Sequence, residues 1–220
     1  MKLSILIPVY NEESTIEKVI ENVKKLPVDK EIIVIDDCSK DKTYEILKKI
    51  EGIKVLHHEK NMGKGAAIKT GLNATTGEYA VIQDADLEYN PEELIKMFEI
   101  AKKEKAKVIY GSRFKGKGKF LPESYIANKF LTFLTNLLFG AKITDMETCY
   151  KMMPTQLFKK LKIEANRFDI EPEITAKVCR LGYKIYEVPI SYSARRKGKK
   201  IGVKDGFKAI FTLIKWKFIK

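Results

Sequence analysis

The 220-residue sequence predicts an α/β fold in which helices cover both faces of a mostly parallel central sheet. In the first half of the chain, short runs rich in Ile and Val alternate with amphipathic segments, as in βαβ units. The runs are almost continuously apolar, which fits strands that are buried on both faces. With 45% hydrophobic and 32% charged residues, the chain can bury a full core without disulfides.

The first half is predicted to contain five strands and four helices. The strands are LSILIPV, EIIVIDD, IKVLHHE, YAVIQDAD and KVIYGSR, and the helices lie near residues 13–25, 41–50, 64–74 and 91–105. The start of the fourth helix is well marked, because Asn90 can cap it, Pro91 suits its first position and Glu93 follows three residues after the cap. The third helix begins at NMGKG, whose glycines and Lys64 could bring backbone N–H groups and a cation to a phosphate, although it is not a P-loop.

The second half is predicted to be less regular. A helix is expected in SYIANKFLTFLTNLLFG, and a further helix ending at Gly182 is followed by the strand in YKIYEVPISY. A basic loop, ARRKGKKIGVKDG, precedes a terminal amphipathic helix. We therefore predict one domain over residues 1–205 and a C-terminal amphipathic helix over residues 206–220, whose apolar face would comprise Phe207, Ile210, Phe211, Ile214 and Phe218.

The net positive charge of the protein comes from the second half of the chain. Residues 1–110 carry 18 Lys and Arg against 20 Asp and Glu, whereas residues 111–220 carry 24 against 9, a net charge of +15. This asymmetry favours phosphates, nucleic acid or acidic lipid as partners, and a solvated lysine surface explains part of it. No RRM, KH or helix-turn-helix pattern accompanies the charge, which argues against nucleic acid. The sequence shows no signal peptide and no run of about 18–20 apolar residues, the length that a membrane-spanning helix needs. Its three cysteines form no CxxC pair, which indicates reduced thiols in the cytosol.

Polar residues collect at the carboxyl ends of the predicted strands, where ligands bind in open α/β sheets. Asp84 and Asp86 follow one such strand, and residues two apart on a strand point the same way. Two neighbouring carboxylates repel each other unless a positive charge lies close by. A divalent cation is one explanation, and solvated loop acids are the other. His57 and His58 are adjacent without a third ligand nearby in sequence and are expected to be structural.

The motifs PVYNEE, IVIDDCSKDKT, GKGAAIKTG and QDADLEYNPEE occur in an order that resembles family 2 glycosyltransferases, above all the dolichyl- or polyprenyl-phosphate sugar transferases. The resemblance continues through YGSRF, TDMETCYKMM and GYKIYEVPISY and covers the chain to about residue 205. It implies a GT-A fold, with residues 1–110 binding a nucleotide sugar and residues 111–205 binding the acceptor.

The resemblance also implies roles for individual residues. Nucleotide-binding positions would be Pro8, Tyr10, Glu12, Asp37 and Asp84, to which the glycine-bearing helix start adds Lys64. The D-x-D pair would hold Mg²⁺ or Mn²⁺, with Asp86 the most direct ligand, and Glu88 stands where many relatives have a metal-assisting Gln. The acceptor phosphate would be bound by Arg113 and Arg195, with Lys129 as a weaker point charge.

The reaction that the resemblance implies is an inverting, metal-dependent transfer of a hexose from GDP-mannose or a UDP-sugar to dolichyl or polyprenyl phosphate. The expected catalytic residues are Asp86, Arg113 and Asp145. The enzyme is expected at the cytoplasmic face of a membrane, to which the terminal helix would bind peripherally. The alternative is that this helix simply packs on the core. A saccharide hydroxyl acceptor is the alternative, and it would need Asp145 or Glu147 as a general base unless these acids bind the donor sugar. A basic nucleic-acid-binding module and an inactive nucleotide-sensing relative are the remaining readings.

Overall fold

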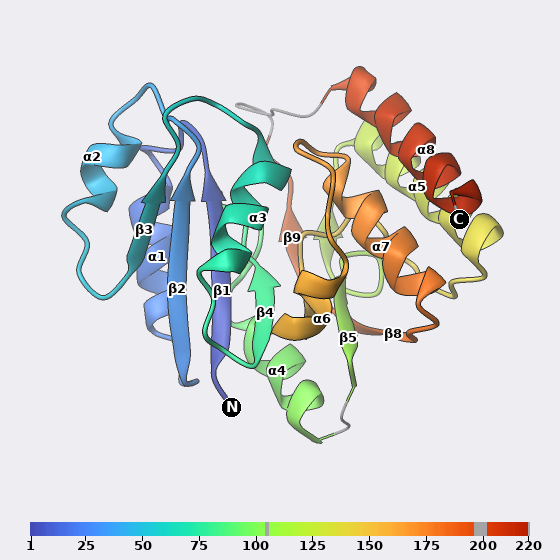
Figure 1. Cartoon of the computed structure of the whole chain (residues 1–220), viewed down its shortest axis with the longest axis horizontal. Coiled ribbons are helices and arrows are strands. Elements are labelled where there is room, and N and C mark those ends of the chain that lie inside the picture. The colour runs from blue at the N-terminus through green and yellow to red at the C-terminus, as the bar shows by residue number, and fades with distance from the viewer. Residues whose placement is uncertain (104–105, 196–201, 220) are drawn as a thin grey trace.

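A seven-stranded sheet forms the centre of the computed structural model, which describes residues 1–103, 106–195 and 202–219 (Figure 1). Its strand order is β3-β2-β1-β4-β7-β5-β8, and a small second sheet pairs β6 with β9. The strands are β1 (Leu3–Val9), β2 (Lys30–Asp36), β3 (Lys54–His57), β4 (Tyr79–Ile82), β5 (Val108–Ser112), β6 (Gly118–Lys119), β7 (Lys151–Pro154), β8 (Ile185–Pro189) and β9 (Tyr192–Ser193).

The central sheet is mostly parallel, as predicted. Strands β3, β2, β1 and β4 pair in parallel, and so do β5 and β8. The exception is β7, which runs antiparallel between β4 and β5 and was not predicted as a strand. Its sequence, KMMP, combines a buried lysine with two methionines and lacks the Ile and Val by which the other strands of the first half were predicted.

Eight helices are described in residues 1–103, 106–195 and 202–219. They are α1 (Ile16–Lys24), α2 (Thr43–Leu47), α3 (Lys64–Asn73), α4 (Glu93–Lys103), α5 (Pro122–Phe139), α6 (Thr155–Lys160), α7 (Ile170–Arg180) and α8 (Val203–Phe218). In Figure 1, α3 lies in front of the sheet and α1 behind it. Several helix ends differ from the predicted ones by two or three residues: α1 begins at Ile16 rather than near residue 13, and α4 begins two residues after Pro91. Helix α8 begins at Val203, so the expected boundary between residues 205 and 206 falls inside it.

Two hydrophobic clusters hold these elements together. The larger one surrounds the sheet, and every residue of β1 is buried because helices cover both of its faces. The smaller one joins α5, α7 and α8 at one end of the molecule, where α5 and α8 lie side by side (Figure 1). Its buried members are Leu131, Ile143, Met146, Ala176, Ala209, Leu213 and Trp216.

Helix α8 has two apolar faces rather than the single one that was predicted. Ala209, Leu213 and Trp216 face the small cluster and are buried, and Ile210 packs at its edge. Large apolar side chains on the opposite side are exposed, and α5 presents similar ones. The exposed set comprises Tyr125, Ile126, Phe130, Phe133 and Leu137 of α5 and Phe207, Phe211, Ile214 and Phe218 of α8, and is called the α5/α8 apolar face below. Among the residues described, no helix combines the length and apolarity needed to span a membrane.

Candidate active site

The loops after β1 and β2 are tied together at the carboxyl edge of the sheet. Asn11, whose φ of 51° is left-handed, donates from its backbone N to Ser39 Oγ and accepts at Oδ1 from the backbone N of Lys40. Pro8 is buried within β1, and Tyr10 is half-buried at the strand end. The first two strands therefore present a fixed edge, at which Pro8, Tyr10 and Asp37 of the sequence prediction lie.

Asp37 is fully engaged in building this edge. Its carboxylate accepts bonds from the backbone N of Met62 (2.8 Å) and of Gly63 (2.7 Å), and it pairs with His58 Nδ1 at 2.8 Å. His58 also contacts Thr70 of α3, so it is structural, as predicted. Asp37 thus anchors the start of α3 to the end of β2, and its two oxygens are committed to the protein itself.

Asp84 and Asp86 lie in the loop after β4 rather than on a strand. Since β4 ends at Ile82, strand alternation does not determine their directions, which corrects the reasoning from sequence. Each acid has its own cation: Lys64 Nζ is 2.8 Å from Asp84 Oδ1, and Arg195 Nη2 is 3.5 Å from Asp86 Oδ2. The structure therefore brings four of the predicted site residues together from three distant parts of the chain.

The electrostatic environment of Asp86 resists a negative charge. Burial, followed by the charges of Asp84 and Glu88, raises the pKa of Asp86 to about 7, and Arg195 opposes the shift. A dication between the acids would remove this repulsion, so the pair fits a divalent metal. Within the described part of the chain, no three His, Cys, Asp or Glu side chains form a ready-made metal cluster. Donor phosphates would have to complete the coordination shell, as they commonly do for Mg²⁺.

Glu88 supports the loop that carries Arg195. Its Oε2 accepts a bond from Tyr192 Oη (2.8 Å), and its Oε1 accepts one from the backbone N of Arg195 (2.7 Å). The Arg195 guanidinium then donates to both carboxylate oxygens of Glu12, at 2.8 and 2.5 Å. Glu12 and Glu88 together fix Arg195 beside Asp86.

Arg113 and Asp145 form a buried bidentate ion pair. The Nε and Nη2 groups of Arg113 donate to Asp145 Oδ2 and Oδ1, each at 2.8 Å, and the backbone N of Arg113 adds a bond of 2.9 Å. Asp145 is fully buried, and Arg113 is 5% exposed. With both oxygens bound, Asp145 is poorly placed to remove a proton from an acceptor and instead orients the guanidinium.

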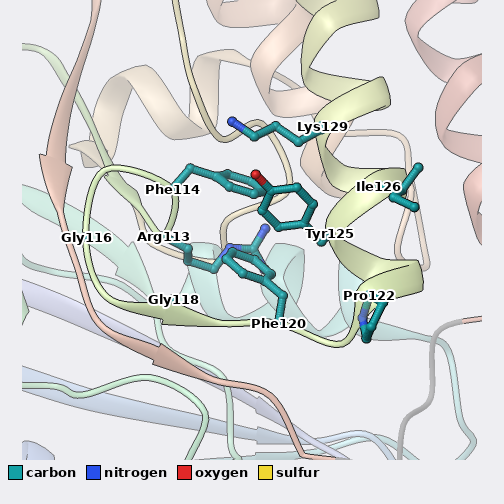
Figure 2. Close-up of a pocket in the computed structure, with 9 residues that line it drawn as sticks. All are labelled: Arg113, Phe114, Gly116, Gly118, Phe120, Pro122, Tyr125, Ile126 and Lys129. Carbon is teal, nitrogen blue, oxygen red and sulfur yellow. The ribbon is translucent and has the colours of Figure 1, made fainter.

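A cavity of about 450 Å³ opens beside Arg113, between the loop before α5 and the first turns of α5 (Figure 2). Phe114 and Phe120 stack with centroids 4.6 Å apart, and Tyr125 meets both edge-on. Lys129 Nζ lies 4.2 Å from the Phe114 ring centre. The cavity therefore joins two cations to aromatic walls, and its lining is completed by Gly116, Gly118, Pro122 and Ile126.

Two charged residues near the site were missed by sequence reasoning. Lys151 is fully buried and Glu171 is 5% exposed, with 3.5 Å between Lys151 Nζ and Glu171 Oε2. Lys151 interrupts the apolar segment CYKMM and Glu171 lies on a helix that is buried almost all round, so charge inside a buried segment was the available signal. Nearby, Glu147 has an Oε1 that is buried without a hydrogen-bond partner among the described residues, and burial raises its pKa to about 7.

The sheet, the acids after β4 and the cationic cavity beyond them define a glycosyltransferase with a GT-A-like fold. The chain belongs to glycosyl transferase family 2, whose family model matches residues 4–162. It is 31% identical to the UDP-N-acetylglucosamine–dolichyl-phosphate N-acetylglucosaminyltransferase of Methanococcus voltae, over 98% of this chain and 96% of that protein. It is 28% identical to the dolichol-phosphate mannosyltransferase of Pyrococcus furiosus, over 98% of this chain and 64% of that protein.

Solved structures agree with this assignment at the level of the fold. The glucosyl-3-phosphoglycerate synthase of Mycobacterium tuberculosis, crystallised with Mn²⁺, UDP and glucosyl-3-phosphoglycerate, matches with a TM-score of 0.77 and 23% identity over all of this chain and 81% of that one. TarS of S. aureus, in complex with UDP-GlcNAc, matches with a TM-score of 0.70 and 20% identity over all of this chain and 68% of that one. The predicted GT-A fold and the predicted enzyme class are therefore confirmed.

Proposed function

We propose that this enzyme transfers a hexose from a nucleotide sugar to dolichyl or polyprenyl phosphate, with inversion at the sugar carbon. The observation that carries the proposal is the position of the cavity beside Arg113 and Lys129. Ile126 lines this cavity and is 69% exposed, and the α5/α8 apolar face begins at the same turn of α5. An acceptor with an anionic head and an apolar tail would place its phosphate near the cations and its tail along α5. The names of the two dolichyl-phosphate relatives support the same acceptor class.

On the donor side, Asp84 and Asp86 would hold Mg²⁺ or Mn²⁺. When bound, the metal would neutralise the diphosphate that leaves as the sugar–phosphate bond breaks. The surrounding residues would bind and orient the donor: Tyr10 at the nucleotide edge of the sheet, which Asp37 holds in place, and Lys64 beside Asp84. The raised pKa of Asp86 supports this assignment, because a group that resists its own charge gains most from a nearby dication.

On the acceptor side, positioning is the main requirement. The second pKa of a phosphate monoester lies near 6, so the acceptor is largely ionised at neutral pH and needs no base. Its oxygen would attack the sugar carbon while the bond to the nucleoside diphosphate breaks. Arg113 has guanidinium N–H groups beyond the two that Asp145 occupies, and these, together with Lys129, would bind the phosphate. Arg195, between Glu12 and Asp86, would contact it from the donor side.

We also propose that the α5/α8 apolar face rests on the cytoplasmic surface of a membrane. Its exposed side chains lie on two helices that pack on the same small hydrophobic cluster at one end of the molecule (Figure 1). Lys208 and Lys217 of α8 would add attraction of about 1 kcal/mol each to anionic lipid headgroups. A membrane-bound acceptor could then reach the cavity without leaving the bilayer.

A saccharide hydroxyl acceptor is the second candidate, favoured by Glu147. A hydroxyl acceptor needs a general base whose pKa lies near the working pH, and the pKa of Glu147 is raised to about 7. Its unpartnered Oε1 would be available for that role. A phosphate acceptor would leave this carboxylate without a catalytic task.

A donor-by-acceptor panel tests the two candidates. Purified protein is incubated with one radiolabelled donor, GDP-mannose, UDP-glucose or UDP-N-acetylglucosamine. The acceptor is a short polyprenyl phosphate, the corresponding alcohol or a disaccharide, and each pair is tested with Mn²⁺ and with EDTA. We expect labelled lipid only with the polyprenyl phosphate and only with metal. Labelled trisaccharide without labelled lipid would refute the proposal, and so would equal transfer to the alcohol.

A further inference from the structure

A chain of alternating charges runs from Asp84 into the interior of the protein. Lys64 Nζ lies between two acids, 2.8 Å from Asp84 Oδ1 and 2.9 Å from Glu171 Oε1. The other oxygen of Glu171, Oε2, is 3.5 Å from Lys151 Nζ. Lys151 also donates to the backbone carbonyls of Met146, at 2.9 Å, and Thr148. The chain therefore ends on the two carbonyls that flank Glu147.

Such a chain is costly for the fold to maintain. Removing two charges from water is unfavourable, and their mutual attraction offsets this only when further hydrogen bonds complete the geometry. Lys151 meets that condition by means of its two carbonyl partners, yet a methionine would fill the same strand position without the cost. Stability alone therefore gives little reason for an ion pair at this position.

We infer that Glu171 and Lys151 are positioning residues that hold Lys64 ready for the diphosphate of the donor. The inference rests on the proposed donor site. Asp84 is shared between Lys64 and the proposed metal position, so metal binding would weaken the hold of Asp84 on the ammonium. Glu171 then keeps Nζ in place from the opposite side, and a donor phosphate oxygen replaces Asp84 as its partner. Lys151 fixes Glu171 and, through the carbonyls of residues 146 and 148, the backbone that carries Glu147.

The predicted loss of affinity is specific to nucleotides that carry more than one phosphate. Without Glu171, the Lys64 ammonium is left paired with Asp84 alone, where it competes with the metal. Loss of one charge-assisted contact should weaken binding of UDP or GDP by roughly 10- to 100-fold in Mn²⁺. UMP and GMP lack the terminal phosphate, and their affinity should remain near that of the wild type.

Calorimetry with UDP, GDP, UMP and GMP, with and without Mn²⁺, tests this on Glu171→Gln. The control is Glu31→Gln, because Glu31 is likewise a partly or fully buried acid paired with a lysine. It accepts further bonds from two backbone N–H groups and lies at the start of β2, the opposite end of the sheet. If Glu171→Gln folds poorly, Lys151→Met/Glu171→Gln removes both charges and leaves no buried lysine unpaired. We expect the diphosphate-to-monophosphate affinity ratio to fall in both Glu171 variants and to be unchanged in the control.

Two results would overturn the inference. A wild-type ratio in the Glu171 variants would show that Lys64 needs no support, and an equal loss for both nucleotides would show a general structural role. Absence of any metal-dependent nucleotide binding in the wild type would instead refute the proposed donor site, and the inference with it.

Discussion

Replacing Arg113 by alanine should destabilise the protein strongly, because it would leave a buried carboxylate without its counter-charge. Asp145 is fully buried and would retain only the backbone N–H of residue 113 out of the three bonds that Arg113 donates. Breaking a buried pair in this way costs about 3–5 kcal/mol. In a protein of this size, 1 kcal/mol corresponds to about 2–4 °C in Tm, so the expected decrease is about 6–20 °C.

A double-mutant cycle separates this structural role from acceptor binding. In Arg113→Met/Asp145→Asn both charges are absent, and the asparagine oxygen can still accept the backbone N–H, so most of the lost stability should return. Affinity for a short polyprenyl phosphate should not return, because the guanidinium is missing. Thermal and urea unfolding give the stabilities, and calorimetry gives the affinities. If Arg113→Ala unfolds at the wild-type Tm and urea midpoint, the buried ion pair does not support the fold as argued.

Three further predictions concern other parts of the structure. Gly65→Ala should lower the free energy of unfolding by about 1–3 kcal/mol, because its Cβ would lie 2.4 Å from the carbonyl oxygen of Ala165. Gly206→Ala is the control, because a Cβ there meets nothing within 4 Å and should not lower this free energy. Urea unfolding compares the two variants. Glu147→Gln should become increasingly stabilising relative to the wild type as pH rises from about 4.5 to about 7. The pKa of Glu147 is raised in the native state, so the wild type loses stability as this carboxyl group ionises. A difference in unfolding free energy that does not change with pH would contradict this. Phe207→Ser/Phe211→Ser should reduce sedimentation with anionic vesicles without changing Tm, because both side chains are exposed. Leu213→Ala should lower Tm, because Leu213 is buried. If the double variant sediments as much as the wild type, the α5/α8 apolar face is not the membrane contact.

The sequence predicted the first half of the fold well, because each signal there was local. Strands β1 to β5 and the helices between them follow apolar runs and amphipathic periods that the chain displays in order. β7 was not predicted because it holds a buried lysine whose partners, Met146, Thr148 and Glu171, are defined only by the tertiary structure. The start of α8 was misplaced because Gly202 and Asp205 form its first turn, through a bond from the backbone N of Gly202 to Asp205 Oδ2 at 2.9 Å, within a stretch whose glycines and lysines suggested a loop.

For the candidate site, motifs identified residues but not their partners. The aspartates after β4 were found from their spacing, yet the cations that hold them, Lys64 and Arg195, come from α3 and from the far end of the chain. Asp37 and Glu88 were expected to meet ligands, and the sequence did not show that each also accepts hydrogen bonds from the protein. A carboxylate motif read from sequence shows where negative charge will collect, whereas the neighbours that are folded against it determine which of its oxygens remain available.

One loop connects the two surfaces on which the proposed function depends. Residues 164–166 lie against the first turn of α3, where the backbone N of Ala66 donates to the carbonyl oxygen of Asn166 at 3.1 Å. The same loop meets α8, since Lys215 Nζ is 2.7 Å from Glu164 Oε2. Close approach of the backbones, at Gly63 and Gly65 against Ala165 and Asn166, leaves no room for a side chain between the loop and α3. The helix that would touch the membrane and the helix that would touch the donor therefore both contact one short segment, although about 140 residues separate them in the sequence.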